Sequence, residues 1–279
     1  MKAADYLLSL LLILGVITLS RFRGFTPLTI QGFDLQDPSL SSPQHPHTVP
    51  AHVNIAVGCC VVLAGILVWA VSVVLQKKSH VRPYNKVVEL LLISLLGFSL
   101  MYLFVKMMKN VAGEPRPYFL AACQPDETLV EELIAQGTTW VNKTLSSIIC
   151  TQTDSLRYRR SFPSGHAAES VYPALLYIFI TSTLHYTSLS ARALTGLTQF
   201  TVFGYSVWVS ATRVLDEHHF WWDVLAGGVV GVVFSTATFY LYLRHVISRR
   251  EENSYQNANC KLVGSDSTII TFESDEPLK

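Results

Sequence analysis

Charged residues are scarce in this chain of 279 residues, because Asp, Glu, Lys and Arg together make up only 15% of it. A soluble domain of this length usually carries about 25% charged residues, so the shortage counts against an ordinary soluble fold. Long apolar runs account for it, and each of six runs is close to the roughly 20 residues that a helix needs to cross a bilayer. They are residues 3–20, 53–75, 87–108, 167–186, 193–211 and 224–243.

The sequence also lacks internal repeats and any basic stripe with interleaved aromatic residues. Because such a stripe is absent, no nucleic-acid partner is expected. We predict an all-α fold, with a polytopic domain of six transmembrane helices over residues 1–247. A disordered cytoplasmic tail is expected over residues 248–279, because this stretch is polar and without apolar periodicity. The first run could instead be a signal peptide, but Arg21-Phe22-Arg23 follows it where a small-residue cleavage site would be needed.

Lysine and arginine beside the apolar runs predict the orientation of the chain. The connection after the second run and the segment after the sixth are both basic, which places them and both termini in the cytoplasm. The third connection, residues 109–166, is then extracellular or luminal. It contains the only N-x-S/T sequon, at Asn142, and two of the five cysteines, Cys123 and Cys150. Glycosylation and a disulfide between these cysteines are therefore expected. The protein itself is expected in the plasma membrane or in the membranes of the endoplasmic reticulum and Golgi.

Charged and titratable residues gather in three blocks at the ends of the apolar runs, where charges are costly and indicate function. The blocks are KNVAGEPRP with Lys109 and Arg116, RRSFPSGH with Ser164, Gly165 and His166, and TRVLDEHHFWWD with Arg213, His219 and Asp223. In the predicted topology all three lie on the extracytoplasmic side and can form one pocket. Lysine and arginine donate charge-assisted hydrogen bonds to phosphate oxygens, so the pocket suits a phosphate.

The PSGH turn precedes an apolar run. A glycine-containing turn at the start of a helix presents backbone N–H groups to an anion, and Ser164 adds a hydroxyl donor. The alternative is an ordinary helix cap, in which the Ser164 side chain satisfies backbone donors and His166 lies at the wet interface.

His219 and Asp223 are four residues apart, so on a helix they would share one face. A carboxylate that accepts one imidazole N–H fixes the tautomer and leaves the other nitrogen as a nucleophile or base. By the same geometry His218 points away, and we favour His219. A zinc site at Asp216–Asp223 is the alternative, but the nearby lysine and arginines would repel a cation, so no metal or other cofactor is expected. A transporter is disfavoured because the charges lie at helix ends.

The three blocks resemble the signature of the type 2 phosphatidic acid phosphatase superfamily, which is K-x6-RP, PSGH and SR-x5-H-x3-D. The resemblance covers roughly residues 21–243. The six runs and the position of the sequon most resemble the lipid phosphate phosphatase, or phospholipid phosphatase, branch. Thr212 stands where the pattern has serine and retains the hydroxyl.

This resemblance implies a role for each residue. Phosphate would be bound by Lys109, Arg116 and Arg213 and cradled by Ser164 and Gly165. His219, oriented by Asp223, would attack phosphorus and become a phosphohistidine. His166 would protonate the departing alkoxide and then activate water.

The resemblance also implies metal-free hydrolysis of lipid phosphates, namely phosphatidate, lysophosphatidate, sphingosine 1-phosphate and ceramide 1-phosphate. Membrane lipids and further copies of the chain, as a homo-oligomer, are the implied partners. Two alternatives remain open. One is another phosphatase on this scaffold, acting on a polyprenyl diphosphate or on glucose 6-phosphate, and the other is a non-catalytic relative. Arg157, Arg159 and Arg160 either attract anionic headgroups or form a solvated basic loop, and the first loop, residues 21–50, is expected to be irregular.

Overall fold

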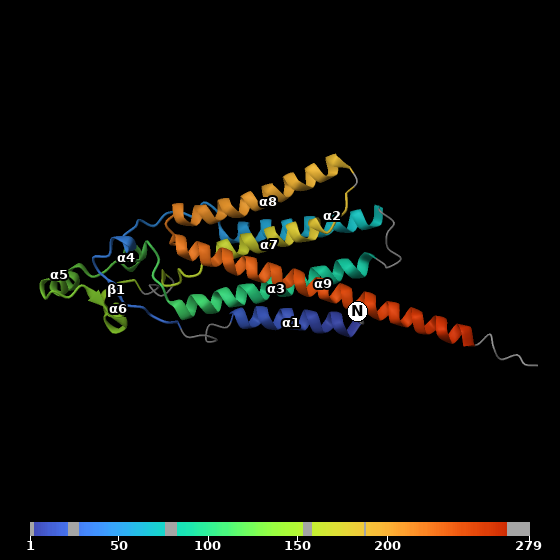
Figure 1. Cartoon of the computed structure of the whole chain (residues 1–279). Helices are drawn as coiled ribbons and strands as arrows, with labels where there is room; N and C mark the ends of the chain where they lie inside the picture. The colour runs from blue at the N-terminus through green and yellow to red at the C-terminus, as the bar shows by residue number, and fades with distance from the viewer. Residues whose placement is uncertain (1–2, 22–27, 76–82, 153–157, 187, 267–279) are drawn as a thin grey trace, which may run out of the picture. The chain divides into compact units, whose positions relative to one another are not determined.

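Figure 1 shows the computed structural model of the chain, which describes residues 3–21, 28–75, 83–152, 158–186 and 188–266. The long helices are α1 (Ala3–Arg21), α2 (Ala51–Leu75), α3 (Pro83–Ala112), α7 (Gly165–Ser182), α8 (Leu189–Leu215) and α9 (Trp221–Asp266). Each contains most or all of one of the six apolar runs, so the prediction of a mainly helical chain is confirmed. Residues 1–239 and residues 240–279 form two compact units.

Within the described residues, three helices are long and apolar enough to cross a membrane, judged by length and composition: Ala51–Leu75, Asn85–Ala112 and Trp221–Ser248. A shorter apolar helix, Tyr6–Leu19, lies within α1, which packs along α3. In α7 and α8 polar residues interrupt the apolar sequence, for example Glu169 and Ser170 in α7, and both are buried within the protein.

Helix α7 has the most enclosed position in the first unit. It packs against α2, α3 and α8, and most of its side chains are buried. Gly227, near the start of α9, approaches α7 so closely that a Cβ atom there would overlap the carbonyl oxygen of Ser164. Only glycine allows backbones to meet at this distance, so Gly227 brings the start of α9 against the PSGH turn.

The first and third connections fold together into a small cap. Its elements are β1 (Phe33–Asp34), the 3₁₀ helix Pro38–Leu40, α4 (Phe119–Cys123), α5 (Glu127–Ala135), β2 (Trp140–Val141) and α6 (Lys143–Ile149). The two strands pair antiparallel, with Phe33 opposite Val141. The labelled cap elements lie beside the end of the bundle where α3 and α8 end and α7 begins (Figure 1). The first loop is therefore less irregular than expected, because its apolar residues pack into the core of the cap.

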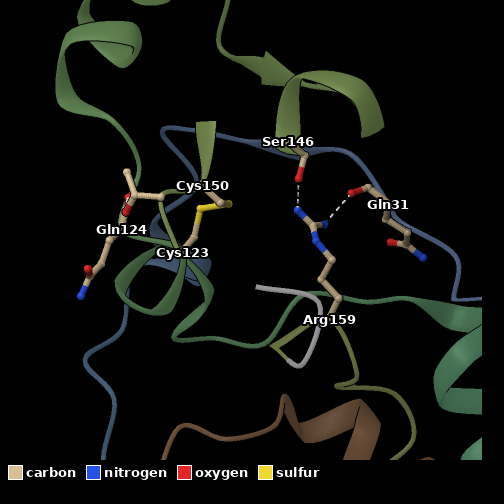
Figure 2. The surroundings of a disulfide bond; sticks show 7 residues. Gln31, Cys123, Gln124, Ser146, Cys150 and Arg159 are labelled. Carbon is tan, nitrogen blue, oxygen red and sulfur yellow. Dashed lines mark hydrogen bonds between the residues drawn. A yellow bond between two sulfur atoms is a disulfide. The ribbon is translucent and has the colours of Figure 1, made fainter. Parts of the chain in front are cut away.

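A disulfide between Cys123 and Cys150 joins α4 to the end of α6 (Figure 2). Arg159 is buried beside it and donates hydrogen bonds to the Gln31 carbonyl oxygen and to the Ser146 hydroxyl. Its guanidinium carbon also lies 4.3 Å from the centre of the Phe119 ring, a cation–π contact. Arg159 therefore stabilises the cap, and both expectations for it, headgroup attraction and a solvated basic loop, are wrong.

The segment after the sixth run differs from the expected disordered tail, because α9 continues to Asp266. Residues 249–263 contain neither proline nor glycine. Extending an existing helix avoids the unfavourable nucleation step, which explains how a polar segment remains helical. Residues 267–279, also predicted to be disordered, lie outside the described residues.

Candidate active site

The three sequence blocks meet at one cavity of about 460 Å³. Its lining residues are Gln44, His47, Ala51, Tyr102, Val105, Lys106, Lys109, Arg116, Tyr118, Tyr158, Arg160, Gly165, His166, Glu169 and His219. Five of these are predicted site residues, and they come from the end of α3 and the segment after it, the start of α7 and the turn before α9. Four lysine and arginine side chains and one carboxylate line the cavity, so its charge favours an anion.

Ser164 and Gly165 form the start of α7. Ser164 occupies the N-cap position, yet its side chain makes no capping hydrogen bond. Its hydroxyl is buried and has no hydrogen-bond partner among the described residues. The alternative of an ordinary Ser164 cap is therefore wrong. Since a buried hydroxyl without a partner is costly, the cost is removed if Ser164 binds a ligand at the helix N-terminus.

His219 and Asp223 come together, although not in the way that the spacing suggested. Helix α9 begins only at Trp221, so the two residues do not share a helical face. Asp223 instead accepts a hydrogen bond from the Phe220 backbone N–H at 3.0 Å, as the N3 residue of a capping box does. The same Oδ2 atom lies 3.4 Å from His219 Nδ1. Nε2 is thus the nitrogen that remains for chemistry.

A serine that the sequence reasoning missed completes this arrangement. The Ser161 hydroxyl donates to Asp223 Oδ2 at 2.5 Å and lies 3.4 Å from His219 Nδ1. The Ser164 backbone N–H also donates to the Asp223 carbonyl oxygen at 2.9 Å. These contacts tie the PSGH turn to the start of α9 and hold Asp223 from two sides.

Burial and nearby cations keep His219 and His166 neutral. Burial, together with Lys109 and Arg116, lowers the pKa of His219 well below its ordinary value. Burial and the Arg213 guanidinium lower the pKa of His166 to about 3. A neutral His219 is suited to nucleophilic attack, whereas a neutral His166 must acquire a proton before it can act as an acid.

Lys109 and Arg116 present donors to the cavity. Lys109 Nζ donates to the carbonyl oxygens of Arg160 and Ser161 at 2.9 and 3.1 Å, which leaves the third of its three N–H donors for a ligand. Arg116 donates from Nη1 to the Tyr118 hydroxyl at 3.1 Å. Its Nε is buried and has no partner among the described residues.

Arg213, the third predicted phosphate ligand, is fully buried beside the cavity and does not line it. Its guanidinium donates to Asp216 Oδ2 at 2.8 Å, to Thr212 Oγ1 at 3.0 Å and to His47 Nδ1 at 3.0 Å. The Thr212 hydroxyl, which a serine at this position would also provide, therefore accepts a hydrogen bond from Arg213 and holds its side chain in place. Although Arg213 does not line the cavity, its positive charge acts on His166, whose pKa it helps to lower.

Glu114 is a further residue that the sequence reasoning missed. It accepts a hydrogen bond from Trp222 Nε1 at 3.0 Å, and its carboxyl group lies within hydrogen-bonding reach of the Asp223 carboxylate. Burial, and next the charge of Asp223, raise the pKa of Glu114 to about 7. A protonated Glu114 can donate to Asp223, and its place between Lys109 and Arg116 in the first block was the signal that could have revealed it.

The remaining predicted residues lie as follows. His218 is buried against His47 and Tyr118 and does not line the cavity. Arg160 lines the cavity, whereas Arg157 lies outside the described residues. Within the described part of the chain, no three or more His, Cys, Asp or Glu residues are grouped so that they could hold a metal ion.

Comparison with known proteins agrees with the three sequence blocks. Residues 90–247 match the PAP2 superfamily. Phospholipid phosphatase 2 of Rattus norvegicus is 27% identical over 253 residues, which cover 88% of each chain. Phospholipid phosphatase 1 of Mus musculus is 26% identical over 81% of each chain. Human phospholipid phosphatase-related protein type 5 is 28% identical over 55% of this chain and 46% of its own.

No solved structure gives a significant match to the chain. The family match includes more than half of the sequence and all three blocks that form the cavity. The chain belongs to the PAP2 superfamily, in its lipid phosphate phosphatase branch.

Proposed function

We propose that this protein is an integral-membrane lipid phosphatase that hydrolyses lipid phosphate monoesters through a phosphohistidine and without a metal. The observation that carries the proposal is the shared cavity of His219, His166, Lys109 and Arg116. A nucleophile, an acid and phosphate-binding cations converge there at the end of an apolar helical bundle. Phosphatidate, lysophosphatidate, sphingosine 1-phosphate and ceramide 1-phosphate are the proposed substrates.

In the first step His219 Nε2 attacks phosphorus, and the bond between phosphorus and the lipid oxygen breaks. Asp223 and Ser161, at Nδ1, orient the ring and favour the positive charge that forms on it. His166 transfers a proton to the departing alkoxide, so that the lipid leaves as a neutral alcohol. Lys109, Arg116 and the N-terminus of α7 stabilise the charge on the equatorial oxygens.

In the second step His166, now neutral, takes a proton from water while the water oxygen attacks phosphorus. The bond between phosphorus and His219 Nε2 breaks, and inorganic phosphate leaves. His166 therefore serves as acid and then as base. Because phosphate monoesters are among the slowest substrates to hydrolyse unaided, most of the acceleration must come from the prearranged cations.

Purified protein in detergent should release phosphate from phosphatidate in the presence of EDTA at the same rate as without it. The lining cations supply the positive charge that a metal would otherwise provide. Loss of activity in EDTA, with recovery on adding a divalent metal, would contradict the metal-free mechanism. Absence of turnover with all four lipid phosphates would contradict the proposed function and favour a non-catalytic relative.

A lipid diphosphate is the second candidate substrate. Lys106 and Arg160 line the cavity in addition to Lys109 and Arg116, so more positive charge is present than one monoester requires. Phosphate release from a polyprenyl diphosphate, measured beside phosphatidate, distinguishes the two. A higher kcat/KM for the diphosphate would assign the protein to that substrate class.

We propose further that all six long helices span the membrane, with both termini in the cytoplasm and the cavity facing outward. Asn142 supports this orientation, since it is exposed and its side-chain oxygen only caps α6, accepting from the Leu145 N–H at 3.0 Å. The side-chain nitrogen is left for a glycan.

Protein produced in eukaryotic cells should lose mass on treatment with an N-glycosidase, as seen by gel electrophoresis, whereas Asn142→Gln should show no such shift. Asn257, in an N-A-N sequence that is no acceptor, provides a matched control, since Asn257→Gln should shift like the unsubstituted protein. An unglycosylated protein whose residue 142 reacts only with cytoplasmic reagents would contradict the orientation.

A further inference from the structure

We propose that His47, in the first loop, is a substrate-contacting residue that donates a hydrogen bond from Nε2 to the bound phosphate. This inference rests on the proposed function and adds a phosphate ligand from outside the three sequence blocks. His47 lies 166 residues before Arg213, yet it lines the cavity beside His166.

The contact with Arg213 determines the protonation of the ring. Arg213 Nη1 lies 3.0 Å from His47 Nδ1, and an arginine guanidinium only donates hydrogen bonds. Nδ1 must therefore carry a lone pair, because an N–H at this position would face another N–H. Since a neutral imidazole has one N–H, the proton lies on Nε2, the ring nitrogen on the side away from Arg213.

Two neighbouring imidazoles fix the plane of the ring. The His47 ring centre lies 3.9 Å from that of His218. It lies 5.9 Å from that of His166, and the His47 and His166 rings are nearly parallel. His166 and His47 both line the cavity, whereas His218, which also contacts His47, does not line it. The Nε2 donor is thus held next to the histidine that is proposed to protonate the leaving group.

Thr48, the residue after His47, binds the first loop to Asp216. The Thr48 backbone N–H and hydroxyl donate to the two Asp216 carboxylate oxygens at 2.9 and 2.6 Å. Asp216 also accepts from Arg213. The first loop is therefore bound to the same turn that carries Arg213 and His219. A loop held only for stability would not require an imidazole in the lining of the cavity.

The test compares two substitutions of His47, one that keeps its hydrogen bonds and one that keeps only its aromatic ring. In His47→Gln the amide oxygen can accept from Arg213 while the amide nitrogen donates to phosphate. In His47→Phe the ring stacking is kept, but both hydrogen bonds are lost. His45→Ala is the matched control, because His45 is exposed in the same loop and does not line the cavity.

We expect His47→Phe to lower kcat/KM for phosphatidate and to weaken competitive inhibition by inorganic phosphate, each by about 10- to 100-fold, as for the loss of a hydrogen bond to a charged group. His47→Gln should recover most of both losses, and His45→Ala should match the unsubstituted protein. Unchanged phosphate inhibition in His47→Phe, with or without an activity loss, would overturn the inference.

A second measurement does not depend on turnover. In protein with ¹⁵N-labelled histidine, inorganic phosphate should shift the one Nε2–H signal that disappears in His47→Gln. If the unsubstituted protein hydrolyses no lipid phosphate, the proposed function fails, and this titration still decides whether His47 contacts phosphate. A His47 signal unaffected by saturating phosphate would overturn the inference even in an active enzyme.

Discussion

Replacing His219 with alanine should lower kcat for phosphatidate on the order of 10⁴- to 10⁶-fold, as the loss of a nucleophile does in other enzymes with covalent intermediates. The imidazole lines the cavity, and Asp223 and Ser161 contact its Nδ1. Without Nε2 there is no atom to accept the phosphoryl group. Expression and glycosylation should be unchanged, because the cap does not involve His219. Phosphate release measured at saturating lipid tests this expectation.

The neighbouring His218 provides a matched control. His218→Phe keeps a ring against His47 and Tyr118 and should lose far less activity than His219→Ala. Acid-labile, alkali-stable labelling by a substrate with ³²P in its phosphate should occur in the unsubstituted protein and in His218→Phe, but not in His219→Ala. Normal hydrolysis or persistent labelling in His219→Ala would remove His219 from the nucleophile's role.

The parts of the site that the sequence predicted are those set by short spacings beside a helix end. Lys109 and Arg116, or Arg213 and His219, are separated by seven and six positions, so the end of one helix places both members of a pair. The prediction for His219 and Asp223 reached the right pair by the wrong geometry. Capping of α9 by Asp223 brings them together, and a four-residue spacing alone does not distinguish a cap from a helical face.

Contacts between distant segments gave no comparable signal. His47 and Thr48 reach Arg213 and Asp216 across more than 160 residues, and the first loop has no periodicity that would reveal a surface. The two nearby arginines, Arg157 and Arg160, suggested for Arg159 either headgroup attraction or a solvated basic loop, and both alternatives are wrong for it. Its burial against Phe119 depends instead on how the first and third connections pack into the cap.

The protonation of His166 leads to the second prediction of a large effect. With a pKa of about 3, caused by burial and next by Arg213, His166 is neutral near pH 7 and cannot act as an acid. A phosphate dianion offsets the surrounding positive charge and so favours a protonated His166. A substrate that binds as the monoanion brings one proton into the site, and transfer to His166 gives the arrangement needed for catalysis.

The pH dependence follows from this proton balance. The kcat/KM for an alkyl phosphate should fall as the pH rises above the second pKa of the substrate, about 6, because the dianion arrives without the proton. The pH profile of kcat/KM between pH 5 and 9 measures this. A profile that rises throughout this range would show that the proton reaches His166 in another way.

Replacing His166 with alanine should lower kcat for phosphatidate by about 10²- to 10⁴-fold, the usual contribution of a general acid or base. An aryl phosphate with a good leaving group, such as p-nitrophenyl phosphate, needs no acid in the first step. It still needs a base in the second, so His166→Ala should release about one equivalent of p-nitrophenol per enzyme and then stall. Rapid-mixing absorbance at the start of the reaction measures this burst.

The burst distinguishes the role proposed for His166 from that of the residues that bind phosphate. Loss of a phosphate ligand such as Arg116 would slow both steps for both substrates and would produce no burst. In His166→Ala the stalled enzyme should carry the acid-labile phosphoryl group on His219, and a small exogenous base such as imidazole should restart turnover. Steady release of p-nitrophenol by His166→Ala at the rate of the unsubstituted protein would assign the base to a different group. Failure to form the burst would mean that His166 positions phosphate and does not move the proton.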